Sequence, residues 1–210
     1  MKTLVQNPIA AFFATLLIIG LISLFGPQEK SLGANVRIVY LHGAWVLVAE
    51  AAFILAGIIG ALGLLSGKIP AFAKRQATLY KGSAALGLTG LVFWVTYLPL
   101  SMWAMQANWS GLFLAEPRFQ LALTFAVVGL LLQASLWLFG LPWLTALGNI
   151  VFVITLLYTF SNADYVMHPP PSPIFGSGIS AVILFFITLI ALTSLAAFFL
   201  FQFWLKTLKK

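Results

Sequence analysis

The sequence predicts an all-α membrane protein, a bundle of six transmembrane helices with both termini in the cytoplasm. Hydrophobic residues make up 62% of the 210-residue chain and charged residues only 7%, and the mean hydropathy is +1.06. A soluble domain carries about 25% charged residues. Polar groups would therefore not cover the surface of this chain, and its main solvent is expected to be lipid. The second observation is that the apolar residues fall into six long runs.

A helix needs about 20 apolar residues to cross the hydrocarbon core of a bilayer. The six runs that meet or approach this length lie at residues 5–25, 37–66, 82–101, 118–139, 142–160 and 177–205. The first is expected to end where Gly26 and Pro27 break the helix, and the third near Pro99. The second exceeds the bilayer and is expected to tilt or project. We expect one six-helix domain over residues 1–210.

The segments between the runs justify the remaining boundaries. The sequence FGLPW makes a tight turn between the fourth and fifth runs, and the prolines of SNADYVMHPPPSPIFG (161–176) forbid a regular helix before the sixth. The tryptophan-rich segment 100–118 is expected to be a loop. The first run, Thr3 to Phe25, is longer than the apolar region of a usual signal peptide, and the SLG at 31–33 is a poor cleavage site. We therefore interpret it as an uncleaved span.

The basic residues predict the orientation. One side of a six-span chain would carry eight of the 11 lysines and arginines, namely Lys2, Lys68, Lys74, Arg75, Lys81, Lys206, Lys209 and Lys210. The other side would carry Lys30, Arg37 and Arg118. Because cytoplasmic loops are enriched in lysine and arginine, this bias places both termini on the cytoplasmic side of the membrane. The expected location is a bacterial or archaeal cytoplasmic membrane, with the functional face outward. Topology thus explains the net charge of +7, and no nucleic-acid partner is expected.

Several classes of chemistry are not indicated. The chain has no cysteine, which excludes disulfides and thiolate metal sites within it. There is no nucleophile elbow, no P-loop and no zinc-protease motif. Two histidines and four acidic residues leave little from which to build a hydrolytic site. Bond-making catalysis is therefore not the expected activity, although the sequence alone leaves the question open.

The two histidines fall on the same predicted side of the membrane. His42 lies about 9 Å along the second span from its outer end, and His168 lies just before the sixth span. Two neutral imidazoles at one membrane face can ligate a haem iron from above and below. The alternative is that each histidine is an interfacial residue with a satisfied hydrogen bond. Haem b, with these two residues as axial ligands, is the cofactor hypothesis.

Other residues on the outer side suit the rest of a haem. Arg37 and Arg118 are expected to pair with the anionic propionates through charge-assisted hydrogen bonds. Packing against the porphyrin ring is expected from Trp103, Trp109 and Phe113. The alternative interpretation of the tryptophans is an aromatic belt at the membrane surface.

Three short stretches carry a resemblance to a known family. These are GANVRIVYLHGAW (33–45), NWSGLFLAEPRFQLAL (108–123) and YVMHPPPSPIFGSG (165–178). Together they resemble the CcmC-type membrane proteins of cytochrome c maturation. Those proteins have a short histidine-containing motif in the second helix, a tryptophan-rich outer motif and a second histidine between helices five and six. Trp109, Glu116 and Arg118 match the first tryptophan, the aspartate and the arginine of that motif. The resemblance implies haem b held between His42 and His168 and presented to a partner in cytochrome c assembly.

The outer motif departs from the family pattern, and this leaves two functions open. Leu112, Phe113 and Ala115 stand where the family has tryptophans, so the surface for a passing haem is reduced. The first function is haem handling with other integral membrane proteins of a cytochrome c assembly complex. The alternative is a b-type cytochrome electron-transfer subunit or a structural subunit of a larger membrane complex.

Polar residues also occur inside the predicted spans. Glu50 is the only acid within one, and a carboxyl group in lipid is costly and often functional. In one interpretation, Glu50 relays a proton or forms a hydrogen bond with a partner chain. In the other, Glu50 is protonated and forms a hydrogen bond with the hydroxyl of Thr89 or Thr96. Gln133 and Asn149 are expected to hydrogen-bond between helices.

Overall fold

The computed structural model describes residues 7–69, 73–164 and 174–208. Across these residues the chain forms six α-helices, one short 3₁₀ helix and no β-strand, which confirms the all-α prediction. The elements are α2 (Pro8–Ser23), α3 (Val36–Ser66), α5 (Gln76–Trp109), α6 (Pro117–Phe139), α7 (Pro142–Ser161), η1 (Phe175–Ser177) and α8 (Ser180–Thr207).

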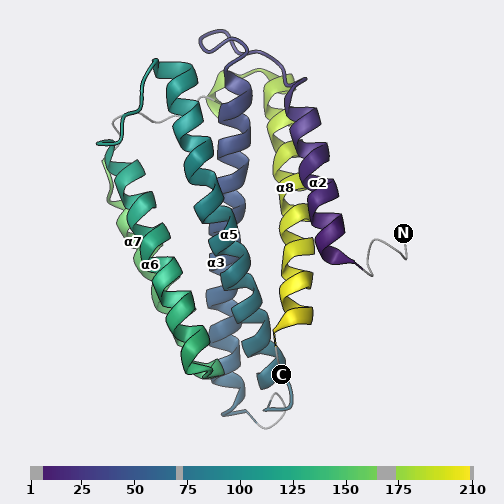
Figure 1. Ribbon diagram of the computed structural model, residues 1–210, viewed down its shortest axis with the longest axis vertical. Helices are drawn as coiled ribbons and strands as arrows, with labels where there is room; N and C mark the ends of the chain where they lie inside the picture. Colours follow the sequence, from purple (N-terminus) through teal and green to yellow (C-terminus); the bar gives the residue numbers. More distant parts are fainter. Residues whose placement is uncertain (1–6, 70–72, 165–173, 209–210) are drawn as a thin grey trace.

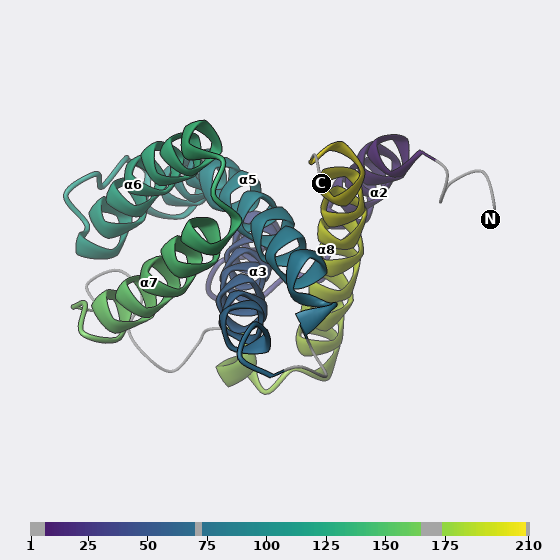
Figure 2. The same cartoon turned by 90° about the horizontal axis from the view of Figure 1, so that it is seen from below.

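The antiparallel pair α3 and α5 forms the centre of the bundle. Helices α6 and α7 pack on one side of this pair, and α2 and α8 lie on the other side (Figures 1 and 2). The upper end of the bundle is the end with residues 24–35, residues 110–116 and η1. The lower end is the end with residues 67–69, residues 140–141 and the last turn of α8.

Helix length and composition fit a bilayer. In the part of the chain that the structure describes, five helices, α3 and α5 to α8, are long and apolar enough to cross a membrane. Helix α2 has 16 residues, fewer than the roughly 20 that span the hydrocarbon core. Many large apolar side chains on the helices are exposed, as expected for surfaces that face lipid rather than water.

The prediction for segment 100–118 was wrong over its first half. Helix α5 continues through Pro99 to Trp109 and ends where Ser110 adopts a left-handed conformation with φ of 56°. A proline removes only one backbone donor, here the partner of the Val95 carbonyl. Apolar helices tolerate this loss when neighbouring helices pack around the site. The loop is therefore limited to residues 110–116.

A buried hydrogen-bond network joins four helices in the lower half of the bundle. Gln133 of α6 donates its side-chain amide to Asn149 of α7 at 2.8 Å. Asn149 donates to the Ser83 hydroxyl and carbonyl of α5, both at 3.0 Å, and the hydroxyl donates to the Ala56 carbonyl of α3 at 2.8 Å. The prediction that Gln133 and Asn149 bond between helices is confirmed.

The central helix α3 approaches its neighbours most closely beside this network. A Cβ atom added at Gly60 would lie 3.0 Å from the Ala146 carbonyl oxygen of α7 and 3.0 Å from the Ser83 hydroxyl of α5. Glycine therefore permits the backbones of α3 and α7 to meet.

The connection between α2 and α3 is organised by one carboxylate. Glu29 accepts hydrogen bonds from the Ser31 hydroxyl, from the Ser31 backbone N–H at 2.8 Å and from the Leu32 N–H at 3.1 Å. These bonds hold the pKa of Glu29 below its ordinary value of 4.5, with the Ser31 hydroxyl as the largest cause. The backbone groups of Glu29 and Gly33 also bond each other, at 2.7 and 3.3 Å.

This loop should lose stability in acid. A carboxyl group with a lowered pKa stabilises the folded loop fully above its ordinary pKa of 4.5, and this contribution disappears as the pH falls through the lowered value. Ser31→Ala removes the main donor, so an NMR titration of the Glu29 carboxyl carbon should give a midpoint nearer 4.5. An unchanged midpoint would show that the hydroxyl does not hold the carboxylate.

Candidate functional site

Five ionisable or polar side chains converge between the central pair and α6, below the upper end of the bundle. We call them the polar cluster: His42, Glu50, Tyr97, Glu116 and Arg118. They come from α3, α5 and the start of α6. The sequence predicted His42, Glu116 and Arg118 at a haem site and Glu50 inside a span. It did not single out Tyr97.

His42 lies in an aromatic environment in the upper part of α3. Its ring is half-buried, its Nδ1 atom is buried, and its ring centroid is 5.5 Å from that of Tyr97. Tyr97 packs in turn on the fully buried Trp94, at 5.1 Å between centroids. The next residue, Gly43, approaches α8 so closely that an added Cβ would lie 3.2 Å from the Phe186 ring. The imidazole is thus held in a largely apolar part of the bundle.

Arg118 reaches into the bundle because α6 begins well below the upper end of α5 (Figure 1). Its guanidinium interacts electrostatically with the Glu50 carboxyl of α3. The same group donates from Nη2 to the Phe160 carbonyl oxygen near the end of α7, at 3.2 Å. The last carbonyls of a helix lack partners within the helix and carry partial negative charge. A single guanidinium therefore joins α3, α6 and α7.

Glu116 caps the start of α6. Its Oε2 accepts the backbone N–H of Phe119 at 2.7 Å, and Pro117 occupies the first helical position, where no N–H is needed. The side chain is only 4% exposed, and its Oε1 is buried without a hydrogen-bond partner among the described residues. Both Glu116 and Glu50 lie close enough to Tyr97 to interact with it electrostatically. The local fold thus fixes a second carboxyl group near Tyr97.

Arg37 lies elsewhere on α3. Its Nε donates to the Gly26 carbonyl at 2.9 Å, and a Cβ at Gly26 would touch Phe185 of α8. Arg37 therefore faces the α2–α3 connection and α8, whereas Arg118 faces α6 and α7. The structure does not bring the two predicted propionate partners together.

The predicted aromatic platform is divided. Trp109 packs edge-on against Phe113, with 6.4 Å between ring centroids. Trp103 is 61% exposed, and Trp109 follows it by six residues, which places the two side chains about 120° apart around the helix. The structure thus brings two of the three aromatic residues together.

The second predicted ligand, His168, lies outside the described residues, but the two ends of its connection do not. Phe160, near the end of α7, packs against Trp94 of α5, with 5.6 Å between ring centroids. On the other side, Phe175 of η1 packs on Phe186 at 5.5 Å. Trp94 packs on Tyr97, which contacts His42, and Phe186 lies against Gly43. The η1 end of the connection therefore packs on a direct neighbour of the His42 segment, and the α7 end is linked to His42 through Trp94 and Tyr97.

Sequence reasoning missed Tyr97 and the partner of Glu50. One available signal was a tyrosine in the middle of an apolar span, since a buried phenol needs a polar neighbour. The partnership of Glu50 with Arg118 had no such signal, because it depends on how deep α6 begins.

No protein-family model, no curated protein and no solved structure matches this chain. Within residues 7–69, 73–164 and 174–208, no three histidine, aspartate or glutamate side chains gather as the ligands of a metal ion do.

Proposed function

We propose that the chain is an integral membrane protein that holds haem b at the upper end of the bundle, with His42 and His168 as the axial ligands. The supporting observation is that one end of the connection that includes His168 packs on Phe186, which lies against Gly43, and the other end is linked to His42 through Trp94 and Tyr97. A chain of four residues reaches at most about 14 Å, and His168 follows Asp164 by four residues. The chain resembles CcmC-type proteins in this pairing of histidines.

The described side chains suit a haem in their chemistry. A half-buried imidazole among aromatic rings offers a neutral nitrogen ligand and apolar contact for a porphyrin. Arg37, nearest the upper end, is the proposed propionate partner, with Trp109 and Phe113 as aromatic contacts. Arg118 and Glu116 serve the polar cluster instead. Haem, when bound, supplies one-electron redox chemistry, and this chain binds and orients it.

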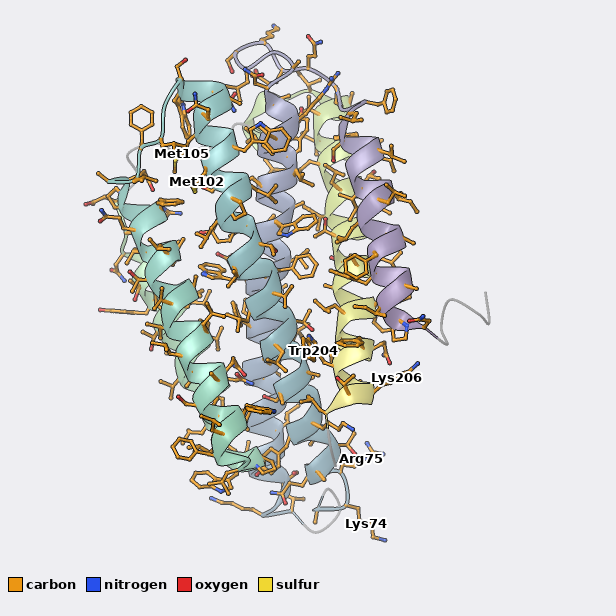
Figure 3. The ribbon with its side chains drawn as sticks, in the orientation of Figure 1. Lys74, Arg75, Met102, Met105, Trp204 and Lys206 are labelled. Carbon is orange, nitrogen blue, oxygen red and sulfur yellow. The ribbon has the colours of Figure 1, made fainter. Side chains whose placement is uncertain are left out.

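The orientation proposed for the membrane follows the basic residues. The lower end of the bundle carries Lys74, Arg75 and Lys206 (Figure 3). Lys68, which follows α3, and Lys81, in the first turns of α5, belong to the same end. Because such residues favour the cytoplasmic side, the lower end and both termini are proposed to be cytoplasmic. The upper end with the haem would then face outward, where a cytochrome c assembly partner would meet it.

A b-type cytochrome subunit of a larger membrane complex is the second candidate. The observation in its favour is that Trp103 lies on a different face of α5 from Trp109, so the aromatic residues do not form one continuous surface for a passing haem. Haem that stays bound and is reversibly reduced fits this candidate. Haem that moves to an apo-cytochrome c acceptor fits the first.

The test is the absorption spectrum of the protein purified after expression with ample haem. The wild type should show the bands of a bis-histidine haem, and His42→Ala and His168→Ala should each lose them. Asn162→Ala, which removes a polar side chain bonded only near the end of α7, should keep them. Free imidazole should restore the bands to His42→Gly. A wild type without haem, or bands that persist in both alanine variants, would contradict the proposal.

A further inference from the structure

The connection between α3 and α5 concentrates positive charge at the lower end of the bundle. Its exposed basic side chains are those of Lys68, Lys74 and Arg75, which we call the basic turn. We propose that the basic turn binds the headgroup of an anionic phospholipid, while an acyl chain of the same lipid lies along the exposed face of α3 above it. The proposal rests on insertion of the helices in a membrane and is independent of haem.

Contacts between α3 and α5 hold the basic turn closed. The Gln76 side-chain amide donates to the Gly63 carbonyl oxygen of α3 at 3.2 Å. A Cβ atom added at Gly67 would lie 2.5 Å from the same amide nitrogen. Lys68 directly follows Gly67, and Arg75 directly precedes Gln76. These two basic residues therefore flank one contact between the helices, and the third is next to Arg75 in the chain.

The positive charge of the basic turn is not balanced by acidic residues at the same end. All four acidic residues of the chain lie at the upper end or midway along the bundle. They are Glu29 in the α2–α3 connection, Glu50 midway along α3, Glu116 at the start of α6 and Asp164 after α7. A group of basic residues beside the end of a transmembrane helix attracts anionic lipid headgroups. Charge complementarity therefore favours an anionic partner.

The neighbouring turn between α6 and α7 marks the depth of the lipid boundary at this end. Trp137 and Trp143, on either side of that turn, are 77% and 48% exposed, and no charged residue occurs between Arg118 and Asp164. Exposed tryptophans favour the boundary between acyl chains and headgroups. The basic turn lies farther down than the α6–α7 turn (Figures 1 and 3). Its charges would therefore lie in the headgroup layer.

An exposed apolar face of α3 leads down to the basic turn. The exposed side chains of this face are those of Leu55, Ile58, Leu62 and Leu65. Because their spacings are three and four residues, they lie on one side of the helix. Lys68 continues the same spacing at the lower end. A free phosphate or an acidic peptide would use the charges alone, whereas a phospholipid would use the charges and the apolar face together.

Fluorescence quenching by brominated lipids tests this proposal on the full-length protein in phosphatidylcholine vesicles. Because the chain has no cysteine, Leu62→Cys places a single bimane label on the apolar face of α3. Brominated phosphatidylglycerol and brominated phosphatidylcholine are compared at equal fractions. The association constant for phosphatidylglycerol should be higher by at least about twofold, since each basic residue near an anionic lipid adds attraction. Concentrated salt should reduce this preference, because it screens exposed charges.

A second label position and further variants assign the preference to the basic turn. Leu131→Cys is the matched control position, because Leu131 is an exposed leucine of α6 above the uncharged turn. The two lipids should quench a label there equally. In the Leu62→Cys protein, replacing all three residues of the basic turn by glutamine should remove the preference, and Lys206→Gln, a change at the same end on α8, should keep it.

Three results would overturn the proposal. The first is equal quenching by the two lipids at Leu62→Cys with the basic turn intact, a measurement that does not depend on how the glutamine variants fold. The second is an equally large preference at Leu131→Cys, and the third is a preference that survives the triple replacement. Absence of quenching by either lipid would also contradict membrane insertion. The haem spectrum of the same samples is a separate readout, so failure of the haem proposal is distinguishable from failure of this one.

Discussion

Gly60→Leu is expected to lower the free energy of unfolding by about 3 kcal/mol, the upper range for overpacking a tight interface. The first added atom would already lie 3.0 Å from the Ala146 carbonyl oxygen, which is backbone and cannot turn away as a side chain can. Helices α3 and α7 would have to separate. Their separation would also strain the Ser83–Asn149–Gln133 network, because Ser83 of α5 is hydrogen-bonded both to Ala56 of α3 and to Asn149 of α7.

The effect can be measured by denaturation with sodium dodecyl sulfate, followed by far-UV circular dichroism. Gly20→Leu is the matched control, because Gly20 lies on the exposed face of α2 with nothing within 4 Å of an added Cβ. It makes the same chemical change on an apolar helix and should leave stability nearly unchanged. Equal midpoints for the two variants would refute the close approach of α3 to α7.

The second large effect is an asymmetry between Glu50 and Arg118, whose side chains interact electrostatically between α3 and α6. Glu50→Ala should cost about 2 kcal/mol, less than the roughly 3–5 kcal/mol measured for fully buried pairs, because Glu50 and Arg118 are half-buried and Glu116 remains. Arg118→Met should cost less than Glu50→Ala. The carboxyl group left behind can take up a proton and become neutral, whereas a guanidinium left behind stays charged.

The same denaturation assay, run at pH 7 on both single variants and on Glu50→Ala with Arg118→Met, tests this asymmetry. The double variant should be more stable than Glu50→Ala alone, since it no longer holds a guanidinium that has lost the Glu50 carboxylate. Asp164→Ala is the control for the loss of an exposed carboxylate. If the double variant is destabilised by the full sum of the single effects, Glu50 and Arg118 do not interact.

The helices could be predicted well from the sequence, and the reasons are physical. Runs of apolar residues bounded by proline, glycine and charged residues place α3, α6 and α7 within one residue of the expected limits at each end. The prediction failed at Pro99, where local chemistry argues for a helix end and tertiary packing overrides it. The lower part of α5 also extends beyond the apolar run, because its first turns contain polar residues such as Gln76 and Lys81, which an apolar pattern does not record.

The polar cluster was predictable only in part. His42, Glu116 and Arg118 were named because their residue types are unusual where they stand, and Glu50 because acids are rare in apolar runs. Their convergence depends on the depth at which α6 begins, which no one-dimensional pattern records. Tyr97 was missed because a tyrosine in an apolar run is compatible with simple packing. The proposed second ligand, His168, stays a prediction.

The low start of α6 has a consequence for the surrounding lipid. At 1.5 Å per residue, α5 is about 50 Å long and α6 about 35 Å. In a bilayer whose acyl chains match the length of α6, the upper walls of α3 and α5 would lie among hydrated headgroups. Arg118, at the start of α6, would then lie near the aqueous boundary, whereas Glu50 is midway along α3.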